Sequence, residues 1–397
     1  MNSQTPPSMA TLVLLSSLSI LSLNMFAPSL TSMAGYFEVS YGMMSLAVGG
    51  YLGITAVLQL ILGPLSDLYG RRPVLIASFG IFTLASIGCA LSTSIEWFLV
   101  FRLLQGAVIS GMALSRAVIR DMVEEKDAAS KMAYVNMAVA IAPMLGPLLG
   151  GLLEQFFGWR SSFVVYFVFG SAMTFLIWQD LGETNTKRSA TFGEQFESYP
   201  ELLRSRRFWG YSICLATSVG GFYTFTAGAP LVAQAVFNMS PAILGLCMGT
   251  ISFGFFLSSF ASTRMSKTYG LTEMMIIGRS LTCIGLGCGL LLLLLGFVSP
   301  LTLFASTFFV GLGNGITLPS ASVGTMSVRP ELAGSASGLS GALTVAAGAV
   351  LTTGTGAILT VENGSYMLVA IILATTVLGL LSAIFVRRVE RQMGIIH

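Results

Sequence analysis

The stretch that decides the fold is Gly63-Pro64-Leu65-Ser66-Asp67-Leu68-Tyr69-Gly70-Arg71-Arg72, a polar loop between two long apolar segments. The segment Met43 to Leu62 precedes the loop and Val74 to Ser92 follows it, and neither contains a charged residue. A helix of about 20 residues spans the ~30 Å hydrocarbon core of a bilayer. Both segments have about that length, so we expect two transmembrane helices joined by this loop.

The same alternation of apolar segments and short polar loops continues along the whole chain of 397 residues. Hydrophobic residues make up 54% of the chain and charged residues only 9%, whereas an ordinary soluble domain has roughly 25% charged residues. Because lipid offers no hydrogen bonds, the backbone of each span must be paired within a helix. We therefore predict an all-α membrane protein with 12 spans. The expected spans are Met9 to Leu30, Met43 to Leu62, Val74 to Ser92, Ile95 to Ile119, Met132 to Leu153, Ser162 to Trp178, Phe208 to Gly228, Pro241 to Ala261, Met274 to Gly296, Leu301 to Val323, Ser335 to Leu359 and Ser365 to Val386.

The positive charges predict how the chain is oriented. Lys and Arg gather in short cytoplasmic loops. With the N-terminus inside, 16 of the 20 Lys and Arg residues fall on the cytoplasmic side, and only Arg160 lies in an outer loop. We expect a multi-pass protein of the bacterial cytoplasmic (inner) membrane with both termini in the cytoplasm. The net charge of +3 is then a topology signal, and we expect no binding of nucleic acid.

A long polar segment divides the chain into two halves. Short pieces of the halves match at an offset of about 200 residues, such as Tyr69-Gly70 with Tyr269-Gly270. Repeated six-helix bundles with a binding site between them are typical of secondary transporters. The expected parts are an N-terminal bundle over residues 1–180, a cytoplasmic linker over 181–207, and a C-terminal bundle with a short tail over 208–397.

The residues of the loop point to a gate. Gly63 would permit close approach of a neighbouring helix, Gly70 a tight turn, and Asp67 an ion pair with Arg71, next to the basic Arg72. The loop resembles the signature loop of the major facilitator superfamily. This resemblance implies a gate on the cytoplasmic side that docks on the start of the eleventh span, where the positive end of a helix dipole suits an aspartate. The alternative is a basic loop that only fixes topology.

The second half lacks these residues at the matching place. Thr263 and Lys267 stand where the first half has its glycine and aspartate, so we expect the functional gate in the first half only.

The fifth predicted span contains a second motif. Its residues are Pro143, Gly146, Pro147, Gly150 and Gly151. Small residues four apart allow close helix packing, and prolines bend a helix. The run resembles the motif typical of antiporters in the same superfamily, which implies export. Ordinary packing glycines are the alternative.

Further short matches cover nearly all of the chain. With the two motifs above, they are similar to the bicyclomycin and chloramphenicol exporters, the Bcr/CflA-type branch. The resemblance implies a major facilitator fold of 12 helices in two pseudo-symmetric bundles and a drug exporter driven by proton antiport. The matches are Tyr51-Leu52-Gly53, Arg102-Leu103-Leu104-Gln105-Gly106, Arg116 to Asp121, Gly221 to Phe225, Ala229-Pro230, Asn238 to Pro241 and Ala333 to Gly338.

One position departs from the proton-coupled relatives. They carry an aspartate in the first span, and the corresponding stretch here is Asn24-Met25-Phe26-Ala27-Pro28. Asparagine cannot carry a proton, and all 17 acidic residues lie in loops or at span ends. Coupling therefore uses another group, such as Asp121 or Glu38, or differs in kind.

Arg102 is the residue we single out for substrate binding. It lies within the fourth span, and no carboxylate at comparable depth is available to neutralise it. We expect it to bind an anionic or strongly hydrogen-bonding substrate, with the alternative that Arg102 is a structural strut. Arg279 is expected to snorkel to the membrane surface. The candidate substrate-binding residues are Asn24, Tyr51, Arg102, Arg116, Tyr223 and Asn314.

These features together predict a secondary transporter that exports a small organic molecule or drug by alternating access. The alternatives are an uncoupled facilitator or importer of a small organic anion, and a membrane sensor that does not transport. The spans hold neither histidine nor a central carboxylate, so we expect no enzyme and no metal site. A phosphate-binding loop for ATP is absent from the sequence. We expect a monomer that uses an ion gradient, of protons, and no other cofactor.

Overall fold

The computed structural model describes residues 7–122, 131–132, 134–135, 139–185 and 199–395, and within them the regular structure is entirely helical. The helices are α1 (Met9–Asn24), η1 (Ala27–Ser29), α2 (Leu30–Tyr36), α3 (Tyr41–Tyr69), α4 (Arg71–Leu91), α5 (Ile95–Leu104), η2 (Gln105–Ile109), α6 (Ser110–Met122), α8 (Ala142–Phe157), α9 (Arg160–Asp180), α11 (Tyr199–Arg204), α12 (Arg206–Leu231), η3 (Val232–Val236), α13 (Pro241–Met265), α14 (Leu271–Leu294), α15 (Pro300–Ser327), η4 (Pro330–Leu332), α16 (Ala333–Ile358) and α17 (Gly364–Gln392).

Ten helical segments of the described residues are long and apolar enough to cross a membrane. The two predicted spans outside this set correspond to α8 and α12. Part of the fifth predicted span, at residues 133 and 136–138, lies outside the described residues. Helix α12 is 26 residues long but begins with two arginines and is rich in Gly, Ser and Thr, and 19 of its residues are buried. The chain is thus an all-helical, multi-pass membrane protein.

Three predicted segments differ in the structure. The loop before Gly70 is helical, because α3 continues through Pro64 to Tyr69. Gly70 ends it with φ of +100°, a backbone angle that glycine adopts readily. The first and fourth predicted spans are each interrupted by a short 3-10 helix, η1 and η2.

Side-chain caps define where several helices begin. The hydroxyls of Ser40, Ser240 and Ser299 each accept a hydrogen bond from the backbone N–H three residues later. Such N-caps satisfy an N–H that has no partner inside the helix. Pro241 and Pro300 follow as the first helical residues, where the missing proline N–H costs nothing.

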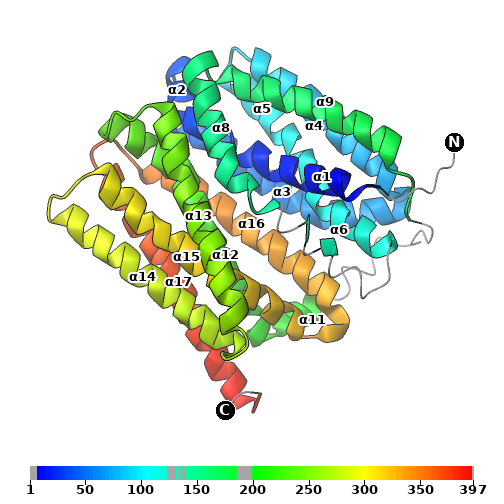
Figure 1. The fold of residues 1–397 in the computed structure, drawn as a ribbon, viewed down its shortest axis with the longest axis vertical. Coiled ribbons are helices and arrows are strands. Elements are labelled where there is room, and N and C mark those ends of the chain that lie inside the picture. The colour runs from blue at the N-terminus through cyan, green and yellow to red at the C-terminus, as the bar shows by residue number, and fades with distance from the viewer. Residues whose placement is uncertain (1–6, 123–130, 133, 136–138, 186–198, 396–397) are drawn as a thin grey trace.

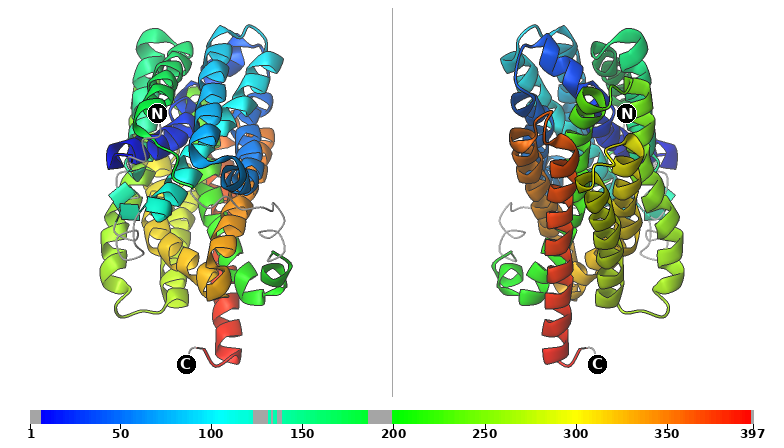
Figure 2. Two further views of the ribbon diagram at one scale, coloured as in Figure 1. Left: turned by 90° about the vertical axis from the view of Figure 1, so that its right-hand side faces the viewer. Right: turned by 90° about the vertical axis from the view of Figure 1, so that its left-hand side faces the viewer.

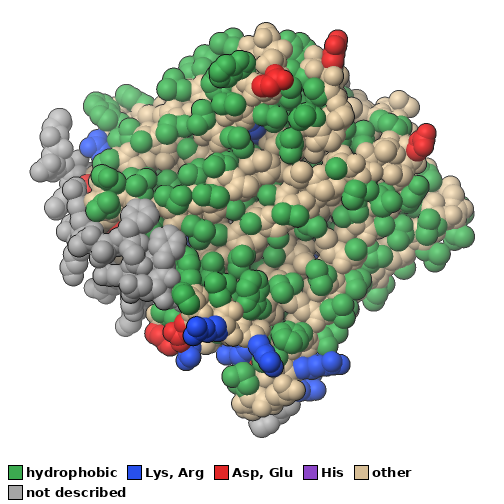
Figure 3. All heavy atoms as spheres, turned by 180° about the vertical axis from the view of Figure 1, so that it is seen from behind, with side chains coloured by type: hydrophobic (Ala, Val, Ile, Leu, Met, Phe, Trp, Pro, Cys, Tyr) green, Lys and Arg blue, Asp and Glu red, His purple; other side chains and the backbone are tan. Residues whose placement is uncertain are grey.

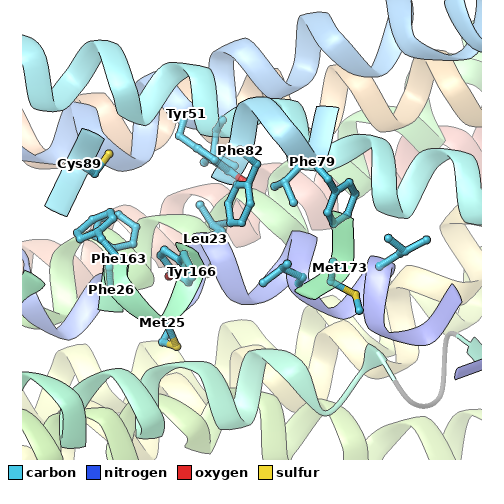
Figure 4. Packing of buried hydrophobic residues seen from close by; sticks show 14 of the residues in the cluster. Leu23, Met25, Phe26, Tyr51, Phe79, Phe82, Cys89, Phe163, Tyr166 and Met173 are labelled. Atoms are coloured by element: carbon cyan, nitrogen blue, oxygen red, sulfur yellow. The ribbon is translucent and has the colours of Figure 1, made fainter. Parts of the chain in front are cut away.

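The helices form two groups, α1 to α9 and α12 to α17, each with its own apolar core (Figures 1 and 2). In the first group, aromatic and aliphatic side chains from several helices meet, including Phe26, Tyr51, Phe82, Phe163 and Tyr166 (Figure 4). Figure 1 shows the two groups splayed. The first group has the chain's N-terminal end at the right of that view, whereas the second has its C-terminal end at the bottom.

We call the end that carries both chain termini the terminal end, and the opposite one the far end. Helix pairs α3 with α16 and α8 with α13 join the two groups. Every hydrogen bond between the groups that the described residues make lies at the far end: Tyr41 donates to the Ala227 carbonyl, Gln234 to the Pro28 carbonyl at 2.8 Å, and the Ala242 N–H to Gln155 at 3.3 Å. The structure is therefore closed at the far end.

The outer surface is apolar. Figure 3 shows hydrophobic side chains over most of the visible face, with a group of Lys and Arg side chains at its lower edge. Large apolar side chains such as Leu84, Phe157 and Leu301 are about 70–80% exposed. A soluble protein rarely exposes so many of them together, and hydrocarbon is the medium that suits this surface.

Candidate functional site

A cavity of about 160 Å³ lies between the two groups of helices. Pro143 at the start of α8 lines one side, and Phe222 of α12, Phe255 of α13 and Asn314 of α15 line the other. Its described lining is apolar except for Ser252 and Asn314, and includes no charged side chain. The remaining lining residues are Ala140, Val219, Ile251, Gly311 and Leu318. The cavity suits an apolar ligand with a few hydrogen-bonding groups.

Asn314 is held in place by a neighbouring arginine. Its side-chain oxygen accepts from the Arg279 guanidinium at 2.5 Å, and its amide donates to the Ser218 carbonyl at 3.2 Å. Arg279 also donates to the Thr317 hydroxyl at 3.1 Å and is only 1% exposed. The expectation that Arg279 snorkels is wrong, because α14 turns it inward onto α15.

Arg102 lies inside the first group and is fully buried. Its guanidinium donates to the Ala47 carbonyl at 3.1 Å, the Ser22 carbonyl at 2.8 Å and the Gln105 side chain at 2.7 Å. No described carboxylate pairs with it. The contacts match the alternative of a structural strut, and Arg102 does not line the interface cavity in this conformation.

Two aromatic rings enclose the same guanidinium. Its central carbon lies 4.2 Å from the centre of the Phe26 ring and 4.1 Å from that of Tyr51. A cation is attracted to the face of an aromatic ring, more strongly away from water. The Tyr51 hydroxyl shares a hydrogen bond of 2.7 Å with Ser22, so Tyr51 belongs to the surroundings of Arg102 rather than to a free binding surface.

The other sequence candidates occupy separate places. Asn24 is 2% exposed and donates to the Ile20 carbonyl at 2.9 Å, while its side-chain oxygen is buried without a hydrogen-bond partner among the described residues. Arg116 is exposed in a second cavity of about 110 Å³ between α1 and α6. Tyr223 packs against Gly348 of α16. The structure therefore unites Tyr51 with Arg102 but does not bring all six candidates together.

The gate residues form a network at the terminal end of the first group. Arg71 is 4% exposed and pairs with Asp67 at 2.5 Å and with Asp121, at the end of α6, at 3.1 Å. Arg72 donates to the Trp178 carbonyl at 2.7 Å. In this conformation a Cβ on Gly63 would meet no atom within 4 Å, so the expected close helix approach is not present.

The start of α16, where the gate is expected to dock, also has free space beside its glycines. A Cβ on Gly334 or Gly338, at the start of α16, would likewise meet nothing within 4 Å. The gate network is complete within the first group, and Gly334 and Gly338 leave one face of α16 free, whereas Ala336 and Leu339 are buried in a cluster that Leu60 of α3 contacts.

Glu183 is a gate residue that the sequence reasoning missed. Its carboxylate accepts from the backbone N–H of Arg71 at 2.9 Å and of Arg72 at 3.3 Å. It thereby caps the N-terminus of α4, where negative charge is favoured. A Cβ on Gly70 would lie 2.2 Å from Glu183, so the cap also requires glycine there. A glutamate directly after the sixth span could have signalled such a cap, but only the fold places it beside Gly70.

The second motif packs by its glycines on two sides of α8. Gly146 faces Asn24, and a Cβ on Gly150 would lie 1.5 Å from the carbonyl oxygen of Met25, the residue that follows α1. On the opposite side a Cβ on Gly151 would lie 2.2 Å from the Pro241 carbonyl oxygen of α13. Close packing of Gly146 and Gly150 agrees with the sequence interpretation, and Gly151 extends it across the two groups. Pro147 joins this contact, because its carbonyl oxygen lies 2.2 Å from where a Cβ on Gly245 would be.

The model of one transporter family, the Major Facilitator Superfamily, matches residues 12–353. The chain belongs to the Major Facilitator Superfamily. Among curated relatives, it is 28% identical to the chloramphenicol resistance protein of Pseudomonas aeruginosa, over 94% of this chain and 90% of that protein. It is 29% identical to multidrug resistance protein D of Escherichia coli, over 84% of each.

The solved structures agree on the fold. A bacterial homologue of the human lysosomal transporter Spinster, in an inward-facing and unoccupied conformation, matches with a TM-score of 0.74. The two sequences are 16% identical, and the match covers 96% of each chain. The predicted major facilitator fold is confirmed, and the protein is a transporter.

Removing the Glu183 cap is expected to weaken the gate of this facilitator. In Glu183→Gln the charge at the N-terminus of α4 is lost, and a cap of this kind contributes ~1 kcal/mol. We expect the apparent melting temperature of the purified protein to fall by a few degrees and transport to slow severalfold. The control is Glu362→Gln, an exposed glutamate in the turn between α16 and α17, which should change neither. Equal behaviour of the two variants would refute the capping role.

Proposed function

We propose that this facilitator exports a small, mainly apolar organic compound of the drug type from the cytoplasm, by alternating access and coupled to protons. The interface cavity carries the proposal, because it lies between two groups of helices that are joined at the far end and splayed at the terminal end. The curated relatives named above, a chloramphenicol and a multidrug resistance protein, support a drug as substrate.

The direction of export follows if the terminal end faces the cytoplasm of a bacterial inner membrane. The charge bias of the loops supports that orientation and both termini inside. The cavity of the present conformation would then be reached from the cytoplasm. Binding there, followed by closure of the gate network and separation of the far end, would release the compound outside.

The moving parts we propose are the two bundles, residues 1–180 and 208–397, with residues 181–207 as linker. Separate apolar cores in the two groups support rigid-body motion, because packed cores shift between discrete arrangements rather than deforming continuously. We propose that one chain suffices, that the ion gradient is the only cofactor, and that no step is catalytic.

Substrate contacts are assigned by exposure in the cavity. Asn314 is the first candidate, because it lines the cavity with an oriented amide. Arg116 lacks a partner among the described residues and faces its own cavity between α1 and α6, which supports a role on the path of an anionic substrate. This is the observation that favours the second candidate function, transport of a small organic anion.

Coupling must use a group other than Asn24. Asp121 supports the proposal best, because it is partly exposed and pairs with Arg71 of the gate. Protonation of Asp121 would weaken that pair and link proton uptake to the gate.

Filling the cavity is expected to stop export. Val219→Phe places a ring where the cavity lies, and overpacking leaves no room for a ligand. In energised inverted vesicles, whose cytoplasmic face points outward, an exporter drives uphill uptake into the lumen. We expect this uptake of chloramphenicol or another resistance substrate to fall at least about tenfold in the variant, and dissipating the proton gradient to abolish it in the unmodified protein.

The matched control is Val350→Phe on α16, where the side chain is 73% exposed and faces away from the interior. It should retain efflux. Efflux that persists in Val219→Phe would refute the cavity as binding site. Downhill, gradient-independent flux in the unmodified protein would favour the alternative of an uncoupled facilitator.

A further inference from the structure

A hollow of about 970 Å³ lies at the terminal end of the second group, apart from the interface cavity. It is formed by α11, the start of α12 and the ends of α15 and α17. Four arginines line it: Arg204, Arg206, Arg207 and Arg329. The transport cycle proposed above assigns no role to these four side chains, although three of them belong to its linker.

The charges of the hollow are only partly balanced. Arg207 pairs with the buried Glu390 at 2.8 Å, and Arg329 pairs with Glu201 at 2.9 Å. Arg204 and Arg206 are exposed and have no partner among the described residues. The described lining therefore keeps two uncompensated guanidinium groups, whose planar donors suit the oxygens of a phosphate.

The backbone adds donors of the same kind. Helix α12 is 26 residues long and begins at Arg206, so its first N–H groups carry partial positive charge into the hollow. The cap residue Ser205 satisfies only the N–H of Phe208, at 3.3 Å. Among the described residues no group accepts from the N–H of Arg206 or of Arg207, which leaves both for an anion.

The position of the hollow fits a lipid headgroup. Trp209, one turn into α12, is 38% exposed and donates its ring N–H to the Leu203 carbonyl at 2.8 Å. Tryptophans of this kind mark the boundary between hydrocarbon and headgroups. The apolar part of the lining is Pro200, Val328, Val389 and Met393, which would contact the glycerol and upper acyl chain.

We propose that this hollow binds the phosphate of an anionic phospholipid headgroup. Basic pockets between transmembrane helices at a membrane surface take such headgroups. The exposed guanidinium groups of Arg204 and Arg206 hold the phosphate, while Arg207 and Arg329 keep their carboxylate partners. The lipid would bridge the linker helix α11 to the second group.

The test uses the purified full-length protein and native mass spectrometry with added phosphatidylglycerol or phosphatidylethanolamine. We expect preferential binding of phosphatidylglycerol to the unmodified protein. Arg204→Gln/Arg206→Gln should weaken that binding about 30-fold, which corresponds to ~1 kcal/mol for each arginine. Arg204→Lys/Arg206→Lys should retain most of it, because the charges remain.

The matched control is Arg264→Gln/Lys267→Gln, which removes two exposed charges from the same end outside the hollow. It should leave phosphatidylglycerol binding within about twofold. Equal losses in the two glutamine pairs would show general charge attraction and overturn the site.

A competition experiment distinguishes a lipid headgroup from free phosphate. Millimolar inorganic phosphate should not displace the lipid, and displacement would overturn the lipid assignment in favour of a free anion. An unchanged elution volume and melting temperature of each variant exclude misfolding as the cause.

Discussion

Gly151→Leu is expected to abolish transport by holding the protein with its far end open. A Cβ at Gly151 would lie 2.2 Å from the Pro241 carbonyl oxygen and 3.0 Å from its carbon, and these are backbone atoms of α13. The facing Gly245 is equally close to the Pro147 backbone of α8. The structure closed at the far end therefore requires glycine, whereas a structure with α8 and α13 separated there has room for leucine.

The size of the effect follows from the cost of overpacking. Inserting a side chain into a fully packed contact costs about 1–3 kcal/mol, which shifts the balance between the two conformations by about 5- to 150-fold. Spin labels at positions 156 and 243, whose native side chains are exposed near the far ends of α8 and α13, report the separation there in a variant with the five native cysteines replaced by serine. We expect a longer distance distribution in Gly151→Leu and loss of efflux at normal protein levels.

Gly354→Leu is the matched control, because a Cβ on Gly354 of α16 meets no atom within 4 Å. It should leave both the distance distribution and efflux unchanged. A short far-end distance in Gly151→Leu would contradict the assignment of this contact as the far-end closure.

Much of this arrangement was predictable from the sequence because it depends on local patterns. Hydropathy placed the spans, and the closeness of Asp67 and Arg71 within one short predicted loop indicated their ion pair. Gly70 was predicted at the turn because positive φ favours glycine. The small residues Gly146 and Gly150 indicated a close helix contact, although not its partner.

Other features depend on contacts between distant segments. Arg279 was expected to reach the membrane surface, but the Asn314 and Thr317 side chains that hold it belong to another helix. The cap by Glu183 joins residues more than 100 positions apart in the chain. The sequence placed Arg102 and Asn314 in different bundles, but it did not reveal that Arg102 is held by carbonyls of its own bundle, away from the cavity that Asn314 lines.

Arg102→Gln is expected to destabilise the protein more than Glu183→Gln or Arg116→Gln. The guanidinium joins α1 through Ser22, α3 through Ala47 and η2 through Gln105. Glutamine is too short and has too few donors to reach all three acceptors. Each buried hydrogen bond to a charged group contributes about 1.5–3 kcal/mol, and the two cation–π contacts are lost as well.

The measurement separates folding from transport. The loss of several kcal/mol should lower the melting temperature by roughly 10 °C, as measured by fluorescence-detected size-exclusion chromatography. It should also reduce the amount of protein in the membrane. Transport per surviving molecule should change little. Arg116→Gln is the matched control on the next helix, since Arg116 has no partner among the described residues, and its melting temperature should be unchanged.

The same pair of variants also decides between the two roles of Arg102. A strut acts through the packing of four spans, since Gln105 passes the contact on to Ser86 of α4 at 2.7 Å. Its removal must therefore lower stability before it lowers the rate per molecule. A variant that melts normally but binds or transports no substrate would instead require the guanidinium to leave its three acceptors during the cycle, and Arg102 would then contact the substrate directly.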